Sequence, residues 1–304
     1  MSTSSNVLPL EVLPAGQESD ALRALFALVF GHPLNAAQWA WKYANPQSFH
    51  VICRDETGAL VGHAAVQHTG CTASGVHVGQ VGDVMVHPSH RGLLSGGVFA
   101  RMLDVLAEEA VRRGFGLCYG FPGDRPARLG LRLGIYLEAL RPQEAHFLPA
   151  SGRESVWTRW VHPVVEVSAQ DVACWLDSNA GLTHRLGRSA VELRWRYLDA
   201  PCCYRFVALG RGRQRQVAIC RNMDDGSVLL MDWVGDGAPT SDGVARMARL
   251  LGCMVRVWSH LLEVPAAVTR HDTPFVVIRL GKVPLPSELA GWIGCCSPGD
   301  VDVY

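Results

Sequence analysis

The residues best placed to do chemistry lie between an apolar run and a helical segment. Residues 84–99 read VMVHPSHRGLLSGGVF, so a cation and a group of small residues separate the two elements. The first amides of a helix have no partner inside it, and the helix dipole places partial positive charge there. Arg91 adds a full charge, while Gly92, Gly96 and Gly97 let a ligand approach the backbone. The pattern favours a phosphate-binding loop over a simple tight turn.

Apolar periodicity predicts the elements that hold this loop. The order is helix, several antiparallel strands, helix, strand, helix and strand, which indicates an α/β fold with a mixed sheet. Gly114 is placed to end the helix that follows the loop. Helices are expected at 19–29, 36–43, 97–113 and 124–134, and strands at 49–55, 60–70, 76–86, 115–121 and from 135 onward.

A short motif appears twice along the chain. QWAWKYANP at 38–46 resembles ELRWRYLDAP at 192–201, and similar strand, helix and strand patterns follow each copy. The repeated order predicts two related halves, residues 1–150 and 151–304. In the second half the corresponding stretch, VGDGAPTSDG, has no arginine and carries acidic residues, which would repel an anion. We expect it to be a degenerate copy that has lost the ligand loop.

The loop and its flanking elements resemble motif A of the GNAT acyltransferase superfamily. The resemblance rests on VMVHPSHRGLLSGGVF and on the later RPARLGLRLGIY, and it covers about residues 79–138. It implies two GNAT-like domains of mixed α/β fold, of which the first binds acetyl-CoA or another acyl-CoA. By the same resemblance the acyl group would contact the backbone of the preceding strand. The implied donor-binding residues are Val84, Met85, Val86, Arg91, Gly92, Leu93, Leu94, Ser95, Gly96 and Gly97.

The match departs from the family pattern at two places. Leu94 stands where the first glycine of the motif belongs. Gly130 stands at the position of the tyrosine that usually acts as the general acid in this family. Amine acylation needs a base for the acceptor and an acid for the leaving thiolate. Asp83 is the candidate base if a bulge breaks the strand alternation, while Tyr119 and Tyr136 are candidate acids. Each of the three could instead have a purely structural role.

Composition and charge exclude several classes of protein. Hydrophobic residues make up 48% and charged residues 18%, which indicates a folded core. Lys+Arg and Asp+Glu both number 28, so net charge indicates neither nucleic-acid nor anionic-membrane binding. No apolar run reaches the roughly 18–20 residues of a membrane span, and we find no secretion signal. We therefore expect a cytoplasmic protein, either a monomer or a homodimer.

The cysteines and histidines predict no metal site. Ten cysteines are scattered or doubled, no C-x-x-C occurs, and no Cys/His group shows a zinc-like spacing. The pair His87 and His90 lacks a third ligand.

The expected function is N-acyl transfer from an acyl-CoA to an amine of a small molecule or sugar by direct attack. Two alternatives stay open. One is a non-catalytic CoA-binding or regulatory protein of the same fold. The other is an acyltransferase that uses a carrier-protein or aminoacyl-tRNA donor.

Overall fold

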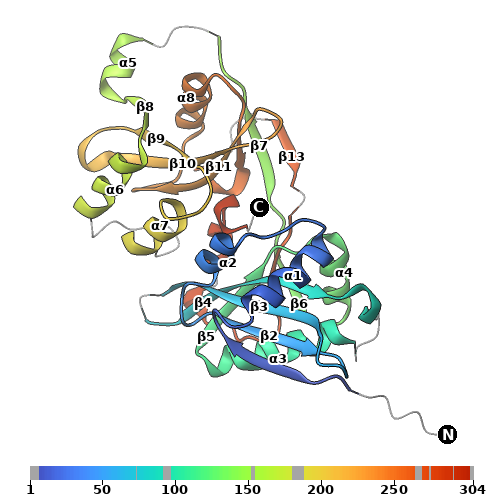
Figure 1. Ribbon diagram of the computed structural model, residues 1–304. Helices are drawn as coiled ribbons and strands as arrows, with labels where there is room; N and C mark the ends of the chain where they lie inside the picture. Colours follow the sequence, from blue (N-terminus) through green and yellow to red (C-terminus); the bar gives the residue numbers. More distant parts are fainter. Residues whose placement is uncertain are drawn as a thin grey trace, which may run out of the picture. The chain divides into compact units, whose positions relative to one another are not determined.

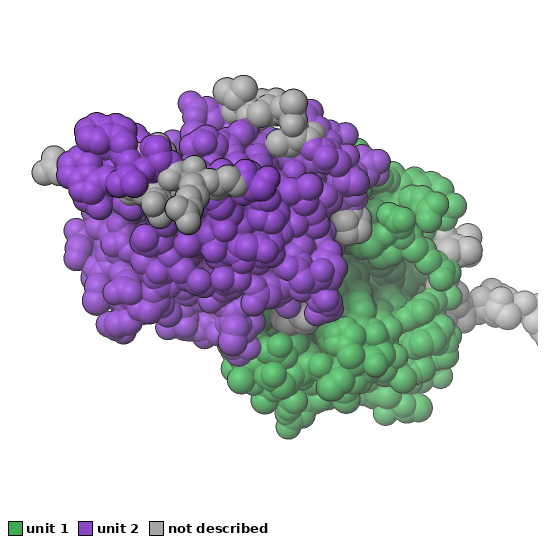
Figure 2. Space-filling view, turned by 90° about the horizontal axis from the view of Figure 1, so that it is seen from above, with its two compact units in different colours: residues 1–139, 276–289 green, residues 140–275, 290–304 purple. Residues whose placement is uncertain are grey.

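Two units, each with its own mixed sheet, make up the protein (Figure 2). Unit 1 comprises residues 1–139 and 276–289, and unit 2 comprises residues 140–275 and 290–304. The division differs from the predicted boundary near residue 150 because each unit takes a segment from the other half of the chain. The structure is a computed structural model, and it describes residues 7–72, 74–91, 97–151, 155–179, 188–263, 269–273, 275–289 and 291–301.

Unit 1 is built on a seven-stranded sheet in the order β1-β2-β3-β4-β5-β14-β6 (Figure 1). The first four strands are antiparallel neighbours, β5 runs parallel to β4, and β14 is antiparallel to β5. β14 comes from the far end of the chain. The strands are β1 (Leu10–Pro14), β2 (Phe49–Arg54), β3 (Leu60–Cys71), β4 (His77–Val86), β5 (Phe115–Gly120), β14 (Val277–Leu280) and β6 (Tyr136–Leu140).

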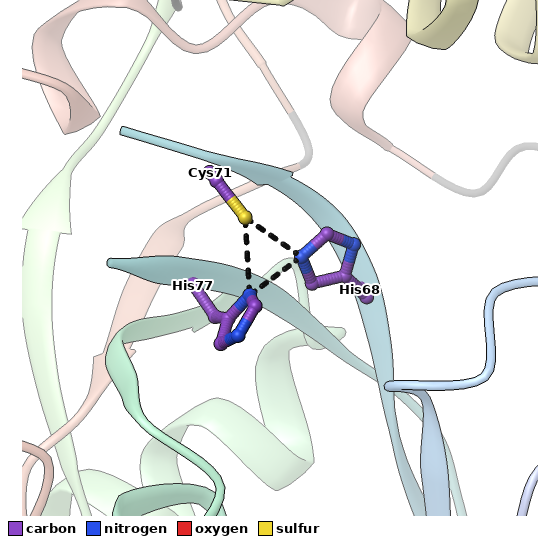
Figure 3. Close-up of side chains that lie close together, drawn as sticks. All are labelled: His68, Cys71 and His77. Carbon is purple, nitrogen blue, oxygen red and sulfur yellow. Dashed lines mark hydrogen bonds between the residues drawn. The ribbon is translucent and has the colours of Figure 1, made fainter. Parts of the chain in front are cut away.

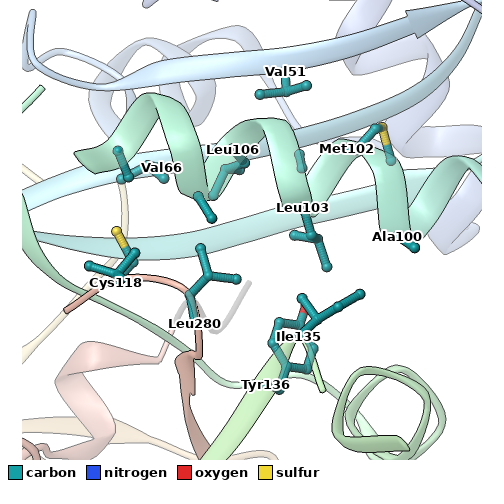
Figure 4. Packing of buried hydrophobic residues seen from close by; sticks show 14 of the residues in the cluster. Val51, Val66, Ala100, Met102, Leu103, Leu106, Cys118, Ile135, Tyr136 and Leu280 are labelled. Carbon is teal, nitrogen blue, oxygen red and sulfur yellow. The ribbon is translucent and has the colours of Figure 1, made fainter. Parts of the chain in front are cut away.

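Two apolar clusters form the core of unit 1. The first lies under α3 (Val98–Arg112), where Met102, Leu103 and Leu106 are fully buried (Figure 4). The second lies under α1 (Ser19–Phe30) and α2 (Ala36–Lys42). The sheet residues alternate between the clusters, as a strand buried on both faces requires. The unit also contains α4 (Asp124–Arg132) and the short 3₁₀ helices η1 (Pro88–His90) and η4 (Ser287–Leu289).

Unit 2 repeats the arrangement of unit 1. Its sheet has the order β13-β7-β12-β11-β10-β9-β8, again with one parallel pair, β11 and β12. β7 pairs antiparallel with β12, just as β14 pairs with β5, so the strands of the two sheets correspond one by one. The strands are β7 (Gln143–Phe147), β8 (Val164–Val167), β9 (Arg205–Leu209), β10 (Gln216–Asn222), β11 (Val228–Val234), β12 (Val255–Trp258) and β13 (Thr269–Asp272).

The repeat of sheet order confirms the mixed α/β class and the two related halves. The helices of unit 2 are α5 (Val156–Val161), α6 (Ala169–Ser178), α7 (Ala190–Tyr197), α8 (Ser241–Leu251), η2 (Gly212–Gln214), η3 (Ser259–Leu261), η5 (Ile293–Cys295) and η6 (Pro298–Asp300). No helix in the described part of the chain is both long and apolar enough to cross a membrane.

Candidate active site

Strands β4 and β5 separate at the middle of the unit 1 sheet. Their parallel pairing runs from His77 opposite Phe115 to Gln80 opposite Tyr119 and then ends. A cavity of about 180 Å³ opens where the strands part. It is lined by Phe30, Val81, Gly82, Asp83, Val84, Tyr119, Gly120, Phe121, Pro122, Gly123, Pro126, Tyr136, Ile278 and Leu280.

A bulge in β4 shapes one wall of the cavity. Gly82 pairs with Ala65 and Met85 with His63, so Asp83 and Val84 together oppose a single residue of β3. Asp83 has φ 48°, a left-handed conformation that is uncommon for a residue other than glycine. Such strain costs about 1–3 kcal/mol and persists only where surrounding contacts hold it. The strand alternation is thus broken at Asp83, which is the condition on which its candidacy as a base depends.

The Asp83 carboxylate is held by two side chains from the end of α2. Lys42 Nζ donates to Oδ1 at 2.9 Å, and the Tyr43 hydroxyl donates to Oδ2 at 2.5 Å. Lys42 is one of only two lysines in the sequence and is fully buried. Burial acts to raise the pKa of Asp83, but Lys42 and Tyr43 outweigh it and hold that pKa below its ordinary value. The carboxylate is thus an anion that is already paired.

A chain of two buried histidines leads to the backbone carbonyl of the same residue, with His63 bonded to the carbonyl and His50 bonded to His63. The Asp83 carbonyl can only accept, so His63 must carry its proton on Nδ1, which lies 2.7 Å from that oxygen. His63 Nε2 then accepts from His50 Nδ1 at 2.9 Å. Burial lowers the pKa of His63 to about 4 and that of His50 to about 3. Both rings are neutral at neutral pH, and with Lys42 and Tyr43 they fix the backbone of Asp83.

Only part of the predicted phosphate loop falls within the described residues. Gly92, Leu93, Leu94, Ser95 and Gly96 lie outside them. Gly97 is the N-cap of α3 with φ −69° and ψ 160°, and no described side chain caps the helix. The Arg91 guanidinium is at the surface, with Nε donating to the Val86 carbonyl at 3.0 Å.

The predicted tyrosines both line the cavity. Tyr119 is fully buried on β5, and its ring contacts that of Phe121 at 5.8 Å. Tyr136 is 4% exposed at the start of β6, and burial raises its pKa above the ordinary value. A Cβ built on Gly130 would lie 2.0 Å from Cδ2 of Tyr136. The Tyr136 ring therefore occupies the space that a side chain at position 130 would fill.

Unit 2 retains a tyrosine and a cation bound to a strand aspartate. It differs at the start of the helix that follows this strand. Tyr197 donates to Asp232 on β11 at 2.5 Å, and Arg188 Nη1 lies 3.2 Å from the same carboxylate oxygen. In contrast, Thr240 caps α8, since its hydroxyl accepts from the amide of Gly243. The start of this helix in unit 2 thus holds a protein oxygen, whereas no side chain of the described residues caps the start of α3 in unit 1.

Sequence reasoning missed Lys42, Tyr43, His50 and His63. The repeated motif contained the signal for two of them, because Lys42-Tyr43 corresponds to Arg196-Tyr197. In both copies the cation and the tyrosine are buried, while the tryptophan before them, Trp41 or Trp195, is only partly buried. The repeat therefore marks the tyrosine that binds the strand aspartate in each unit. The motif cation binds that aspartate in unit 1, whereas Arg196 donates to the Gly299 carbonyl in unit 2.

Comparisons with known proteins agree with this geometry. Residues 14–130 match the family model described as an acetyltransferase (GNAT) domain. A search of curated protein sequences gave no match.

Solved structures extend the likeness to both units. A probable N-acyltransferase from Enterococcus faecalis has 15% identity, with 91% of this chain and 73% of that chain covered and a TM-score of 0.59. A GCN5-related N-acetyltransferase from Anabaena variabilis has 15% identity, 90% and 73% coverage, and a TM-score of 0.60. A tandem GNAT protein from the clavulanic acid biosynthesis pathway has 13% identity, 91% and 100% coverage, and a TM-score of 0.54. At these identities the likeness to solved structures is one of fold, and the chain folds as two GNAT-like halves. The family match identifies residues 14–130 of the first half as a GNAT acetyltransferase domain.

Proposed function

We propose that the protein is an acyl-CoA-dependent N-acyltransferase that uses acetyl-CoA and acylates an amine of a small molecule or sugar. Unit 1 would carry the reaction, and unit 2 would bind no acyl donor. The observation that carries the proposal is the cavity between β4 and β5, whose lining residue Tyr136 contacts the ring of Phe99 in the first turn of α3 at 6.2 Å. Uncapped amides at a helix start attract a diphosphate, and a gap between strands can accept the thioester arm.

The donor would be held chiefly by backbone. Residues 91–97 would bind the diphosphate through their amides, with Arg91 adding charge. Val84, Met85 and Val86 would align the thioester along the free edge of β4. A backbone N–H at this edge would stabilise the oxyanion that develops as the amine attacks.

The reaction would be a direct transfer. The amine nitrogen forms a bond to the thioester carbon, the carbon–sulfur bond breaks, and the thiolate leaves with the electron pair. A proton must reach that thiolate, and the Tyr136 hydroxyl is a candidate donor because it lines the cavity and is protonated at neutral pH. Tyr119 is the second candidate on the same cavity wall.

Asp83 is assigned a positioning role in this scheme. Its carboxylate already accepts from Lys42 and Tyr43, and its lowered pKa makes it a weak base. Its contribution would be to hold the bulge that separates β4 from β5. The acceptor amine would then lose its proton to a water molecule, which a backbone carbonyl at the cavity can orient by accepting a hydrogen bond.

The decisive test is acetyl-CoA binding and thiol release with a panel of primary amines, in the wild type and in Gly97→Asp. Asp at an N-cap stabilises a helix by a few tenths of a kcal/mol relative to Gly, but it occupies the amides and adds negative charge. We expect Gly97→Asp to keep its fold and lose acetyl-CoA binding. Thr240→Asp, which exchanges one capping residue for another in unit 2, is the matched control and should bind normally.

Three outcomes separate the candidate functions. Binding with turnover supports the transferase. Tight binding without turnover of any amine favours a non-catalytic CoA-binding protein. If Gly97→Asp binds acetyl-CoA as tightly as the wild type, the donor site has been assigned to the wrong helix.

A further inference from the structure

Three potential metal ligands converge at the far end of the β3–β4 hairpin, away from the cavity (Figure 3). His68 Nε2 lies 3.1 Å from His77 Nδ1, and Cys71 Sγ lies 3.4 Å from the first nitrogen and 3.0 Å from the second. The three ligand atoms therefore form a small triangle. The side chains point toward one another from two neighbouring strands.

The hairpin register explains how residues of unequal spacing share one face. Cys71 and His77 are direct partners across β3 and β4, so their side chains lie on the same side. His68 is three residues before Cys71 and would point to the opposite face in a regular strand. A register shift between His68 and Gly70, with Gly70 at φ 153°, restores it to the same side. The bulge thus assembles the triangle.

The spacing of the three atoms suits a tetrahedral ion. Zn–N bonds of about 2.0–2.1 Å and a Zn–S bond of about 2.3 Å give tetrahedron edges of roughly 3.3 Å between nitrogens and roughly 3.5 Å from nitrogen to sulfur. The observed edges are shorter by 0.5 Å or less, so a small outward movement of the ligands admits the ion. One thiolate with two imidazoles is a donor set that Zn²⁺ accepts.

The surroundings allow an ion to enter and then hold it. Cys71 and His77 are partly exposed, whereas His68 is only 7% exposed. The Phe115 ring lies 5.6 Å from that of His77 and 6.0 Å from that of His68, which gives the cluster an apolar wall. We propose that His68, Cys71 and His77 bind a Zn²⁺-type divalent ion, with a water molecule as the fourth ligand.

The site is separate from the proposed acyl-transfer reaction. His77 begins β4 and Asp83 lies six residues further on, which corresponds to ~20 Å at ~3.3 Å per residue. An ion here would link the two strands next to the turn of the hairpin and would not touch the donor. Its effect should therefore be on stability, and metal binding can be tested whether or not the protein acylates amines.

Asn45 allows a test of the metal site that depends on which nitrogen of His68 carries the proton. Its Oδ1 accepts from the amide of Gln47, so its Nδ2 faces His68 Nδ1 at 2.9 Å and donates to it. That arrangement leaves the His68 proton on Nε2, which suits a metal-free hydrogen-bonded cluster. A metal needs the Nε2 lone pair, so the proton must move to Nδ1, where a hydrogen-bond acceptor is required. Asn45→Asp supplies that acceptor and should tighten metal binding about tenfold.

The experiment uses the full chain after chelator treatment, titrated with Co²⁺ while the thiolate-to-cobalt absorption is followed, and then with Zn²⁺ in competition. We expect one equivalent to bind and Zn²⁺ to displace Co²⁺. Removing a second-shell partner typically costs 10–100-fold in metal affinity, so Cys71→Ser and His77→Ala should each weaken binding by at least about 100-fold. Cys174→Ser, which removes an exposed thiol elsewhere, is the matched control.

Several results would overturn the site. The first is that the wild type does not bind Co²⁺ or Zn²⁺ stoichiometrically. The second is that Cys71→Ser has a native circular-dichroism spectrum and binds the metal as tightly as the wild type. The third is that the protein binds Cu⁺ but neither Co²⁺ nor Zn²⁺. Alkylation of Cys71 at the same rate with and without Zn²⁺ would also exclude it and would indicate a histidine-paired thiol instead. Loss of acylation activity in Gly97→Asp with Zn²⁺ binding intact would leave the metal site standing.

Discussion

The Tyr43 hydroxyl donates to the Asp83 carboxylate at 2.5 Å, and the same bond recurs in unit 2 between Tyr197 and Asp232, also at 2.5 Å. In each unit the tyrosine ends the helix that carries the repeated motif, and the aspartate lies on the strand before the parallel partner. Because unit 2 keeps this bond without an open helix start, the bond itself is a property of the fold. We propose that its link to an acyl donor is specific to unit 1.

Replacing each tyrosine by phenylalanine separates stability from function. Hydrogen bonds to charged groups contribute about 1.5–3 kcal/mol, so Tyr43→Phe and Tyr197→Phe should lower the free energy of unfolding of their units by similar amounts. Only Tyr43→Phe should also weaken acetyl-CoA binding, because it loosens the bulge at Asp83. Urea denaturation and calorimetric titration measure the two effects. Equal losses of binding in both variants would contradict the assignment of Asp83 as a positioning residue.

The histidine pair predicts acid sensitivity. Their pKa values of about 3 and about 4 lie below the ~6.5 of an unfolded chain. Above about pH 6.5 both rings are neutral in the folded and the unfolded chain. Below about pH 6.5 the unfolded chain binds protons on these rings, whereas the folded chain does not until the pH reaches the lowered pKa values. The free energy of unfolding should fall by about 1.4 kcal/mol per pH unit for each ring as pH drops from about 6.5 to about 4. Asp83 titrates at a lower pH than this window, because its pKa is lowered from an ordinary value of 3.8. Its contribution to the free energy of unfolding is therefore lost only at lower pH.

Urea denaturation between about pH 7 and about pH 5 checks this slope. His50→Gln removes one of the two rings and should reduce the slope by about half. His162→Gln, at an exposed ring of unit 2, is the control and should leave the slope as it is in the wild type. A slope that His50→Gln does not change would show that other groups dominate.

Tyr136→Phe tests the proposed acid. A positioned general acid contributes roughly 10²–10⁴-fold to the rate. We expect kcat to fall by at least about 100-fold while the affinity for acetyl-CoA stays within about threefold of the wild type. Tyr119→Phe removes the other hydroxyl of the cavity wall and should have the smaller effect. If the two variants exchange these results, Tyr119 is the acid.

Gly130→Ala tests how tightly the Tyr136 ring is packed. The new methyl group would overlap a ring held at 4% exposure, so we expect a loss of about 1–3 kcal/mol in the free energy of unfolding. Gly291→Ala places a methyl group where no atom lies within 4 Å and should change stability little. Comparable thermal midpoints for the two variants would mean that the ring moves aside freely.

Local pattern accounts for much of unit 1. The apolar stripe predicted helix α3, and Gly114, with φ 80°, follows its end as expected from the sequence. The alternating runs predicted strands β2, β3 and β4. These features depend on neighbours within a few residues, which is the range over which periodicity carries information.

Features that depend on residues far apart in the chain could not be predicted from the sequence. β14 joins the first sheet and β7 the second, and no local signal shows which sheet a short apolar strand will enter. Asp83 was placed at a bulge by hypothesis, but its partners Lys42 and Tyr43 lie about 40 residues away. His68, Cys71 and His77 have no familiar spacing because a register shift brings them together.

Calorimetric titration with acetyl-CoA tests the central claim most directly, because its stoichiometry counts the donor sites in a chain with two GNAT-like halves. The uncapped α3 and the capped α8 predict one site per chain, abolished by Gly97→Asp and kept by Thr240→Asp. Two sites per chain, no binding at all, or one site that survives Gly97→Asp would contradict the account.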